Sequence, residues 1–271
     1  AYTDIPKGEA TGNLEVRDHA HVARILHNDQ GRVTGVEYFD KDGALQFQAA
    51  RLVAVAGNSF ESPRLLLNSA SSMFPDGLAN SSGQVGRNYM RHTTGSVYGI
   101  FEKPVRMWRG TTMAGIMQDE ARHDPSRGFV GGYELETLSL GLPFMAAFLD
   151  PGSWGREFTS ALDQYEYMAG LWIVGEDMPQ ETNRVTLSDT VDKFGLKVAN
   201  VNFSDHANDI AMRNHAYERG QAMYRAMGAT RTLPTPPYPS THNLGTNRMS
   251  ERAEDGVVNR WGQSHDIPNL F

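Results

Sequence analysis

A histidine in a glycine-containing loop is the residue of this sequence best suited to acid–base chemistry. His242 lies in the run 241–249, Thr-His-Asn-Leu-Gly-Thr-Asn-Arg-Met, directly after the proline-rich segment 233–239. That segment is extended and stiff and delivers the histidine at a fixed angle, while Gly245 lets the backbone approach a ligand closely. From the loop alone, two interpretations stay open: an acid–base residue, or an ordinary surface or hydrogen-bonded histidine.

The remaining histidines offer less chemistry. His19 and His21 alternate on a predicted β run and would point to the same face, but no third ligand with a recognisable spacing follows, so we expect no metal site. His92 closes the Gly86-Arg87-Asn88 motif, and we expect it to help hold that loop. His206 and His215 fall at the start and on the face of a predicted helix, and His265 falls in a turn.

The first part of the chain should form a β meander that feeds a buried strand and a helix. Turn signals at 28–31 and 41–43 separate the predicted β runs, which are 14–16, 22–26, 33–39, 45–47 and 52–56. The following helix should have Ser62 as its cap and Pro63 at its first position. Residues 71–88 are expected to be a loop.

An antiparallel sheet and a long helix should follow. The spacing of the candidate strands favours an antiparallel arrangement; they are 96–101, 112–117, 129–137, 168–175, 185–187 and 196–203. The helix should run over 207–227, capped by Asp205 or its neighbours and ended by Gly228. Together the elements indicate a mixed α/β protein.

Composition excludes several classes of function. The 271 residues carry a formal net charge of −7 with acidic and basic residues mixed, so we expect no nucleic-acid partner. The absence of cysteine rules out disulfides, thiolate zinc sites and a cysteine nucleophile, yet leaves cytoplasm and periplasm both open. No apolar run approaches the roughly 18 residues of a membrane span. Because the chain starts without methionine and stops in the apolar run 267–271, we expect a piece of a longer protein.

Two separated signatures resemble the glucose-methanol-choline (GMC) oxidoreductase family. The first is the downstream pattern His242-x-x-Gly245-Thr246-x-Arg248-Met249, followed by Gly256-Val257-Val258-Asn259 and by 267–271. The second lies upstream and comprises Asn13-Leu14-Glu15-Val16, Val22, 35–38, 54–57, 62–67, 85–88 and His92. Within the family, segments 63–69 and 74–88 are similar to bacterial sugar and polyol dehydrogenases of the gluconate, fructose and sorbitol type.

The resemblance implies a fold and a cofactor. It implies part of an FAD-binding doubly wound domain plus an antiparallel-sheet substrate domain flanked by helices. Residues 1–92 would belong to the FAD-binding domain, 93–232 to the substrate domain, and 233–271 to the returning FAD-binding domain that carries the catalytic histidine. The implied reaction is the FAD-dependent oxidation of the CH–OH group of a sugar, polyol or other alcohol.

The resemblance also assigns roles to single residues. His242 would be the general base, a role suited to an imidazole, whose ordinary pKa is about 6.5 and which is therefore largely neutral at working pH. Val22 matches the position whose backbone pairs with the adenine edge of FAD, with an ordinary strand residue as the alternative. Ala56 and Gly57 match small residues near the cofactor, although Gly57 could also be a strand-ending turn. Arg248 is more simply a loop-anchoring donor than a charge near the flavin.

Four residues on the predicted substrate-domain strands are candidates for a sugar pocket, because aromatic faces and carboxylates suit polyols. They are Tyr133, Glu134, Trp172 and Glu176.

The chain also departs from the family pattern. No Gly-x-Gly-x-x-Gly fingerprint occurs in it, and the family's second catalytic histidine or asparagine and its acidic-Gly-Ser turn are likewise missing. We therefore expect this chain alone to be inactive and not to hold FAD stably. One interpretation is an active flavoenzyme, whose possible partners are a small subunit and a cytochrome electron acceptor. The other is a non-catalytic substrate-domain remnant that binds a sugar or a partner protein.

Overall fold

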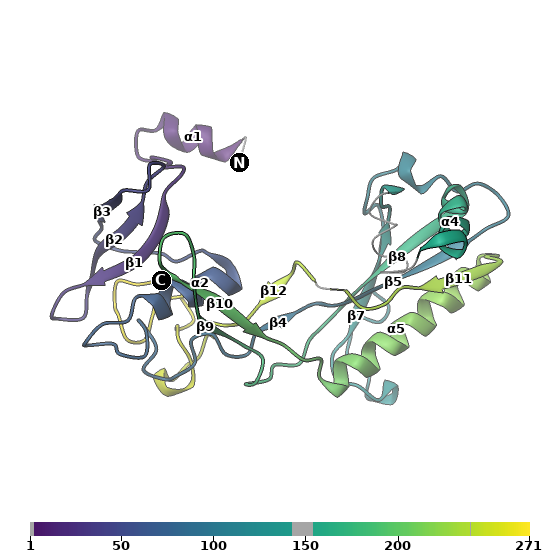
Figure 1. The fold of residues 1–271 in the computed structure, drawn as a ribbon. Coiled ribbons are helices and arrows are strands. Elements are labelled where there is room, and N and C mark those ends of the chain that lie inside the picture. The colour runs from purple at the N-terminus through teal and green to yellow at the C-terminus, as the bar shows by residue number, and fades with distance from the viewer. Residues whose placement is uncertain (1–2, 143–153, 239) are drawn as a thin grey trace. The chain divides into compact units, whose positions relative to one another are not determined.

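The computed structural model describes residues 3–142, 154–238 and 240–271, which form two compact units (Figure 1). Unit 1 comprises Ala1–Tyr89, Glu181–Asn202 and Gly245–Phe271; unit 2 comprises Met90–Gln180 and Phe203–Leu244. Relative to the boundaries expected from the sequence, 181–202 lies in unit 1, and 233–244, which includes His242, lies in unit 2.

Unit 1 begins with a short helix and a three-stranded antiparallel meander (Figure 1). The elements are α1 (Asp4–Ala10), β1 (His21–His27), β2 (Val33–Phe39) and β3 (Leu45–Ala49). The predicted hairpin corners are confirmed: Gly31 and Gly43 have the positive φ angles that such turns require. The predicted strand at 14–16 is wrong, because these residues are largely exposed and pair with no strand among the described residues.

Helix α2 (Asn58–Asn68) starts earlier than the sequence suggested. Its N-cap is Gly57, and Pro63 lies inside the helix rather than at its first position. Ser62 is not the cap; its hydroxyl instead accepts the Gly57 N–H at 3.0 Å from within the helix. The helix therefore lacks one backbone hydrogen bond at Pro63 and gains this side-chain bond near its start.

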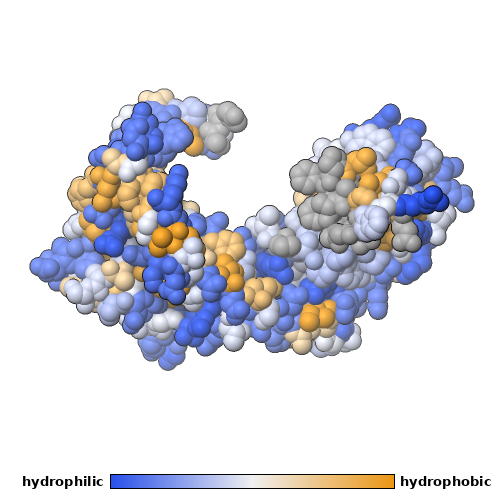
Figure 2. Space-filling model, viewed as in Figure 1, coloured by the Kyte–Doolittle hydropathy of each residue, from blue (hydrophilic) through white to orange (hydrophobic). Residues whose placement is uncertain are grey.

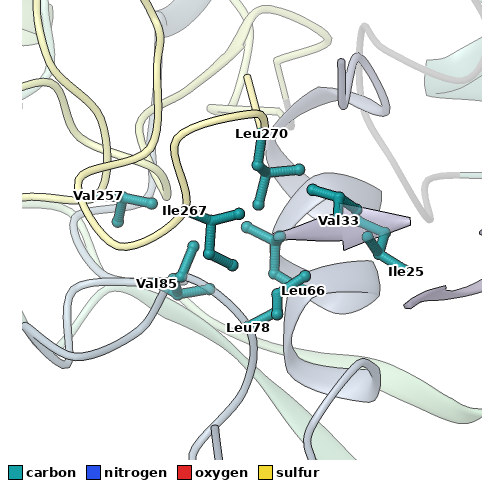
Figure 3. Packing of buried hydrophobic residues seen from close by; sticks show 9 residues of the cluster. Ile25, Val33, Leu66, Leu78, Val85, Val257, Ile267 and Leu270 are labelled. Carbon is teal, nitrogen blue, oxygen red and sulfur yellow. The ribbon is translucent and has the colours of Figure 1, made fainter. Parts of the chain in front are cut away.

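The core of unit 1 joins segments that are far apart in the sequence. Ile25, Val33 and Leu66 pack against Ile267 and Leu270 from the last residues of the chain (Figure 3). Of the predicted strand 52–56, Val53 pairs in parallel with Leu270, and the Val55 N–H donates to the Phe271 carbonyl at 2.7 Å. The hairpin of β9 (Arg184–Val191) and β10 (Lys197–Asn202) packs on α2, and η4 spans Ala253–Asp255.

Unit 2 is built on a five-stranded sheet with the order β11-β5-β8-β7-β6, and its antiparallel pairing is as predicted. The predicted strands 185–187 and 196–203 do not belong to this sheet, because they pair with each other as the β9–β10 hairpin. Its strands are β5 (Thr93–Ile100), β6 (Ile116–Met117), β7 (Tyr133–Leu138), β8 (Met168–Gly175) and β11 (Arg231–Pro234). A two-stranded ribbon of β4 (Met90–Arg91) and β12 (Asn243–Leu244) adjoins it in sequence. The short helices are η1 (Met107–Arg109), η2 (Pro125–Arg127), α4 (Gly155–Asp163) and η3 (Tyr165–Tyr167).

Helix α5 (Ala207–Ala226) covers one face of this sheet and confirms the predicted helix (Figure 1). Its cap is His206, whose ring Nδ1 accepts the Asn208 N–H, while the Asp209 carboxylate accepts the His206 N–H. The opposite face of the sheet carries a second apolar cluster that includes Tyr98, Leu138 and Trp172. No helix in the described ranges is long and apolar enough to cross a membrane.

Candidate active site

Two histidines meet because their strands pair. β12 and β4 are antiparallel, with Asn243 opposite Arg91 and Leu244 opposite Met90, so His242 and His92 occupy the next opposed positions. Their Nδ1 atoms are 2.9 Å apart, and the two rings meet edge to face at a centroid distance of 4.9 Å. The His242 side chain is exposed, and its Nε2 forms no hydrogen bond within the described part of the chain.

The segment before His242 is fixed by hydrogen bonds to β5. The Thr235 N–H donates to the Ser96 carbonyl at 2.8 Å, and the Thr94 hydroxyl donates to the Tyr238 carbonyl. The Ser96 and Tyr238 hydroxyls lie 2.8 Å apart, and burial raises the pKa of Tyr238 to about 12. These contacts hold the chain that leads to His242 against the sheet.

Trp172 supports the ring of His242. It lies on β8, directly opposite Ser96 of β5, and its indole meets His242 at a centroid distance of 5.4 Å. The imidazole is therefore held by an aromatic contact from the sheet and by the Nδ1 contact to His92, while the backbone N–H of His242 donates to the Ser240 hydroxyl at 3.0 Å.

A cavity of about 160 Å³ lies beside His92 and is bordered by two carboxylates, those of Glu134 and Glu176. The Glu134 carboxylate accepts a hydrogen bond from Gln118 at 3.0 Å, and Glu176 lies so close to Gly131 that a Cβ there would collide with its Oε2. Burial, together with the nearby His242, lowers the pKa of His92, while Glu134 and Glu176 oppose that shift.

The four residues predicted to line a sugar pocket fall on two faces of the sheet. Trp172 contacts His242, and Glu134 and Glu176 border the cavity. Tyr133 also borders the cavity, but its buried ring packs toward α5, where its hydroxyl lies 2.8 Å from Nδ1 of His215. Sequence reasoning gave His92 only a structural role, because the pairing of β4 with β12, which brings it to His242, has no local signal in the sequence.

The three residues predicted to contact the cofactor line one groove in unit 1. Val22, Ala56 and Gly57 border a space of about 680 Å³ between β1, segment 50–57 and α2. Val53 and Val55 pack against the core, which leaves the small side chains of Ala54 and Ala56 exposed toward the groove. β1 is an edge strand, so backbone groups on its free side can pair with a ligand.

This groove fits part of a flavin dinucleotide. Most of its walls are small or apolar, which suits a flat ring system, and polar groups at its border come from His21, Glu61 and Arg64. Gly57 has a local structural reason as well, because a Cβ there would lie 3.3 Å from Glu61 Cβ and from the Ser62 nitrogen.

The remaining predicted positions have structural explanations. His19 lies outside β1 with a φ of 50°, and the His21 ring stacks on Phe194 at 4.8 Å. Among the described residues, no three potential ligands cluster in a way that could hold a metal ion. Arg248 anchors its loop through its backbone carbonyl, which accepts the Val257 N–H at 2.9 Å, whereas its side chain is exposed.

Comparison with known proteins identifies relatives of the whole chain. It is 37% identical over 286 residues to 2-methyl-1,2-propanediol dehydrogenase of Mycolicibacterium austroafricanum, an alignment that covers 100% of this chain and 51% of that protein. It is 27% identical to the gluconate 2-dehydrogenase flavoprotein of Pantoea cypripedii, covering 95% of this chain and 45% of the relative. It is also 27% identical to the fructose dehydrogenase large subunit of Gluconobacter japonicus, in an alignment that covers 98% of this chain and 49% of that protein. The chain thus spans about half the length of these curated relatives.

Solved structures share the fold. A crystal structure of formate oxidase matches with a TM-score of 0.62 at 18% identity, covering 93% of this chain and 54% of that chain. A variant of the Aspergillus oryzae RIB40 formate oxidase matches with a TM-score of 0.59 at 19% identity and the same coverage. Family models described as GMC oxidoreductase match residues 5–94 and 179–271. The chain therefore belongs to the GMC oxidoreductases, a family of FAD-binding enzymes.

Proposed function

We propose that this chain is part of an FAD-dependent dehydrogenase or oxidase of alcohols, in which His242 is the general base. The observation that carries the proposal is the state of the His242 ring. It is exposed, its Nδ1 is held by His92, its ring contacts the Trp172 indole edge to face, and its Nε2 forms no hydrogen bond with a described residue. A fixed imidazole with one unengaged nitrogen is suited to taking a hydroxyl proton.

The groups around His242 support an alcohol bearing several polar groups as the substrate. The cavity next to His92 offers the carboxylates of Glu134 and Glu176 as hydrogen-bond acceptors for hydroxyl groups. Trp172 is largely buried, so its indole supports the His242 ring from the sheet rather than lining the cavity. The names of the relatives, which include a diol, a gluconate and a fructose dehydrogenase, agree with this class.

In the proposed reaction, the protein's own groups bind and deprotonate the alcohol. The substrate O–H bond breaks as its proton moves to Nε2 of His242, and the C–O bond becomes a carbonyl as the carbinol C–H bond is lost. FAD, when bound, is the acceptor of the hydride. Val22, Ala56 and Gly57 would border the bound cofactor. A general base is typically worth about 10² to 10⁴ in rate.

The proposal also covers the partners of the full protein, including the one that accepts its electrons. One relative is named as a large subunit, which supports a smaller partner subunit for the full protein, and we include a cytochrome electron acceptor in the proposal.

The deciding experiment replaces His242 with alanine in the full-length flavoprotein. We expect the His242→Ala variant to retain flavin. In stopped-flow measurements, a polyol should reduce that flavin about 10² to 10⁴ times more slowly than it reduces the flavin of the wild type. His123→Ala is the matched control, because His123 is an exposed histidine of the same unit. A rate of flavin reduction in His242→Ala equal to that of the control would exclude His242 as the base.

A further inference from the structure

We propose that His92 is a positioning residue that holds His242 in the tautomer whose Nε2 is free to accept the substrate proton. This inference rests on the proposed function of His242 and adds a residue to which sequence reasoning gave no part in the chemistry.

The contact between the two rings is a hydrogen bond between their Nδ1 atoms. Two nitrogens 2.9 Å apart share one hydrogen, so one Nδ1 donates and the other accepts. If His242 donates, its Nδ1 carries the hydrogen and its Nε2 has a lone pair. If His92 donates, the hydrogen of neutral His242 must sit on Nε2, which then cannot act as a base. The direction of this one bond therefore decides whether His242 is active.

The surroundings of His92 favour its role as the acceptor. The titratable groups that face it are His242, Glu134 and Glu176. Burial and the proximity of His242 lower the pKa of His92, so it is neutral and carries only one ring hydrogen. The two carboxylates border the same cavity as His92 and favour that hydrogen on Nε2, the nitrogen remote from His242. Nδ1 of His92 then carries a lone pair that is directed at Nδ1 of His242.

The backbone around His92 is built to hold this direction. Asp177 accepts the Arg91 N–H at 2.8 Å through one carboxylate oxygen and the Thr93 hydroxyl at 2.6 Å through the other. Both neighbours of His92 are thus bonded to one side chain, that of Asp177. β4, which leads into His92, is also paired with β12, which follows His242. When His242 takes up the substrate proton, its Nδ1–H still donates to His92, so the bond persists through the transfer.

The test compares two replacements of His92 in the full-length flavoprotein. His92→Leu removes the acceptor, whereas His92→Asn places an amide oxygen near the position of Nδ1. We expect His92→Leu to slow flavin reduction by at least about tenfold at neutral pH and to alter its pH profile. We expect His92→Asn to recover most of the rate, with flavin content unchanged in both variants. A rate and pH profile of His92→Leu equal to wild type would overturn the inference, as would an asparagine variant as slow as the leucine variant.

A spectroscopic readout stands apart from activity. With ¹⁵N-labelled histidine in the full-length protein, we expect the His242 ring of the wild type to carry its hydrogen on Nδ1, and His92→Leu to move it toward Nε2. An Nε2–H tautomer of His242 in the wild type would overturn the inference even if His92→Leu does not fold. If His242→Ala reduces flavin at the control rate, the proposed function fails; if only the His92 variants behave as wild type, this inference alone fails.

Discussion

The side chain of Asn269 completes the hydrogen bonding of Val33, 236 positions away in the sequence. Its Oδ1 accepts the Val33 N–H at 2.9 Å, and its Nδ2 donates to the Val33 carbonyl at 2.8 Å and to the Arg51 carbonyl at 2.9 Å. Asn269 is only 5% exposed, so this amide acts as a buried replacement for a missing strand neighbour. It joins the last residues of the chain to the meander sheet.

Removing that amide should destabilise unit 1. Asn269→Ala leaves buried backbone groups of Val33 and Arg51 without partners, at a cost of about 2–4 kcal/mol in the free energy of unfolding. Urea unfolding monitored by circular dichroism measures the change. Asn13→Ala, at an exposed asparagine, is the control and should differ from wild type by less than about 0.5 kcal/mol. Equal midpoints for the two variants would contradict the role assigned to Asn269.

A second link within unit 1 makes its stability depend on pH. Arg64 donates to Asp192 at 2.6 Å and to the Lys197 carbonyl at 2.8 Å, and it is largely buried. Burial would raise the pKa of Asp192, but the hydrogen bonds from Arg64 and from backbone amides outweigh it and lower that pKa. Because the pKa of Asp192 is lower in the folded state, the ionised carboxylate stabilises the fold at pH values above its unfolded pKa of about 3.9. This stabilisation is lost as the pH falls through the pKa of the folded state.

We therefore expect Arg64→Gln to cost about 2–3 kcal/mol at pH 7 and to make the free energy of unfolding fall less steeply below about pH 4. Denaturant titrations at pH 7, 5 and 3 measure both effects. Arg252→Gln is the control, because its ion pair with Asp255 is exposed and should contribute little to stability. A pH dependence of Arg64→Gln as steep as that of the wild type would show that this contact does not set the pKa of Asp192.

How much of the fold the sequence revealed depends on how local the signal was. β2 and β8 lie over the residues that alternation, apolar runs and turn signals indicated, since each pattern is complete within about eight residues. The candidate strand 112–117 shortens to Ile116–Met117, because its pairing with β7 extends over only two residues. Pro63 was expected to start a helix, but its environment inside α2 depends on Gly57 and Ser62.

How much of the candidate site could be predicted also depends on how local the signal was. The motif around His242 marks the residue, but its partner His92 lies 150 positions away and is found only through the pairing of β4 with β12. Alternation along β7 places Tyr133 and Glu134 on opposite faces, yet cannot tell which face α5 covers. That choice is a tertiary one, made where Tyr133 meets His215.

The packing of α5 on β5 requires glycine on the sheet. A Cβ at Gly99 would lie 2.7 Å from ring atoms of the buried Tyr224, and neither group has room to move freely. We expect Gly99→Ala to lower the free energy of unfolding by about 1–3 kcal/mol through overpacking. Thermal unfolding gives the comparison with Gly110→Ala, where the nearest atom to a new Cβ is 3.8 Å away. If both variants melt at the wild-type temperature, the contact of Tyr224 with Gly99 is not tight.

The groove in unit 1 can be tested by filling it. Ala56 is exposed toward the groove, so Ala56→Leu adds three carbons to the space without touching the core behind Val53 and Val55. In the full-length protein we expect substoichiometric flavin, measured as the ratio of flavin to protein absorbance, with an unfolding midpoint close to that of the wild type. Ala44→Leu adds the same group in the exposed turn between β2 and β3 and should retain full flavin. Stoichiometric flavin in Ala56→Leu would place the cofactor elsewhere, whereas loss of flavin in both variants would mean that the added leucine, not the filled groove, disturbs binding.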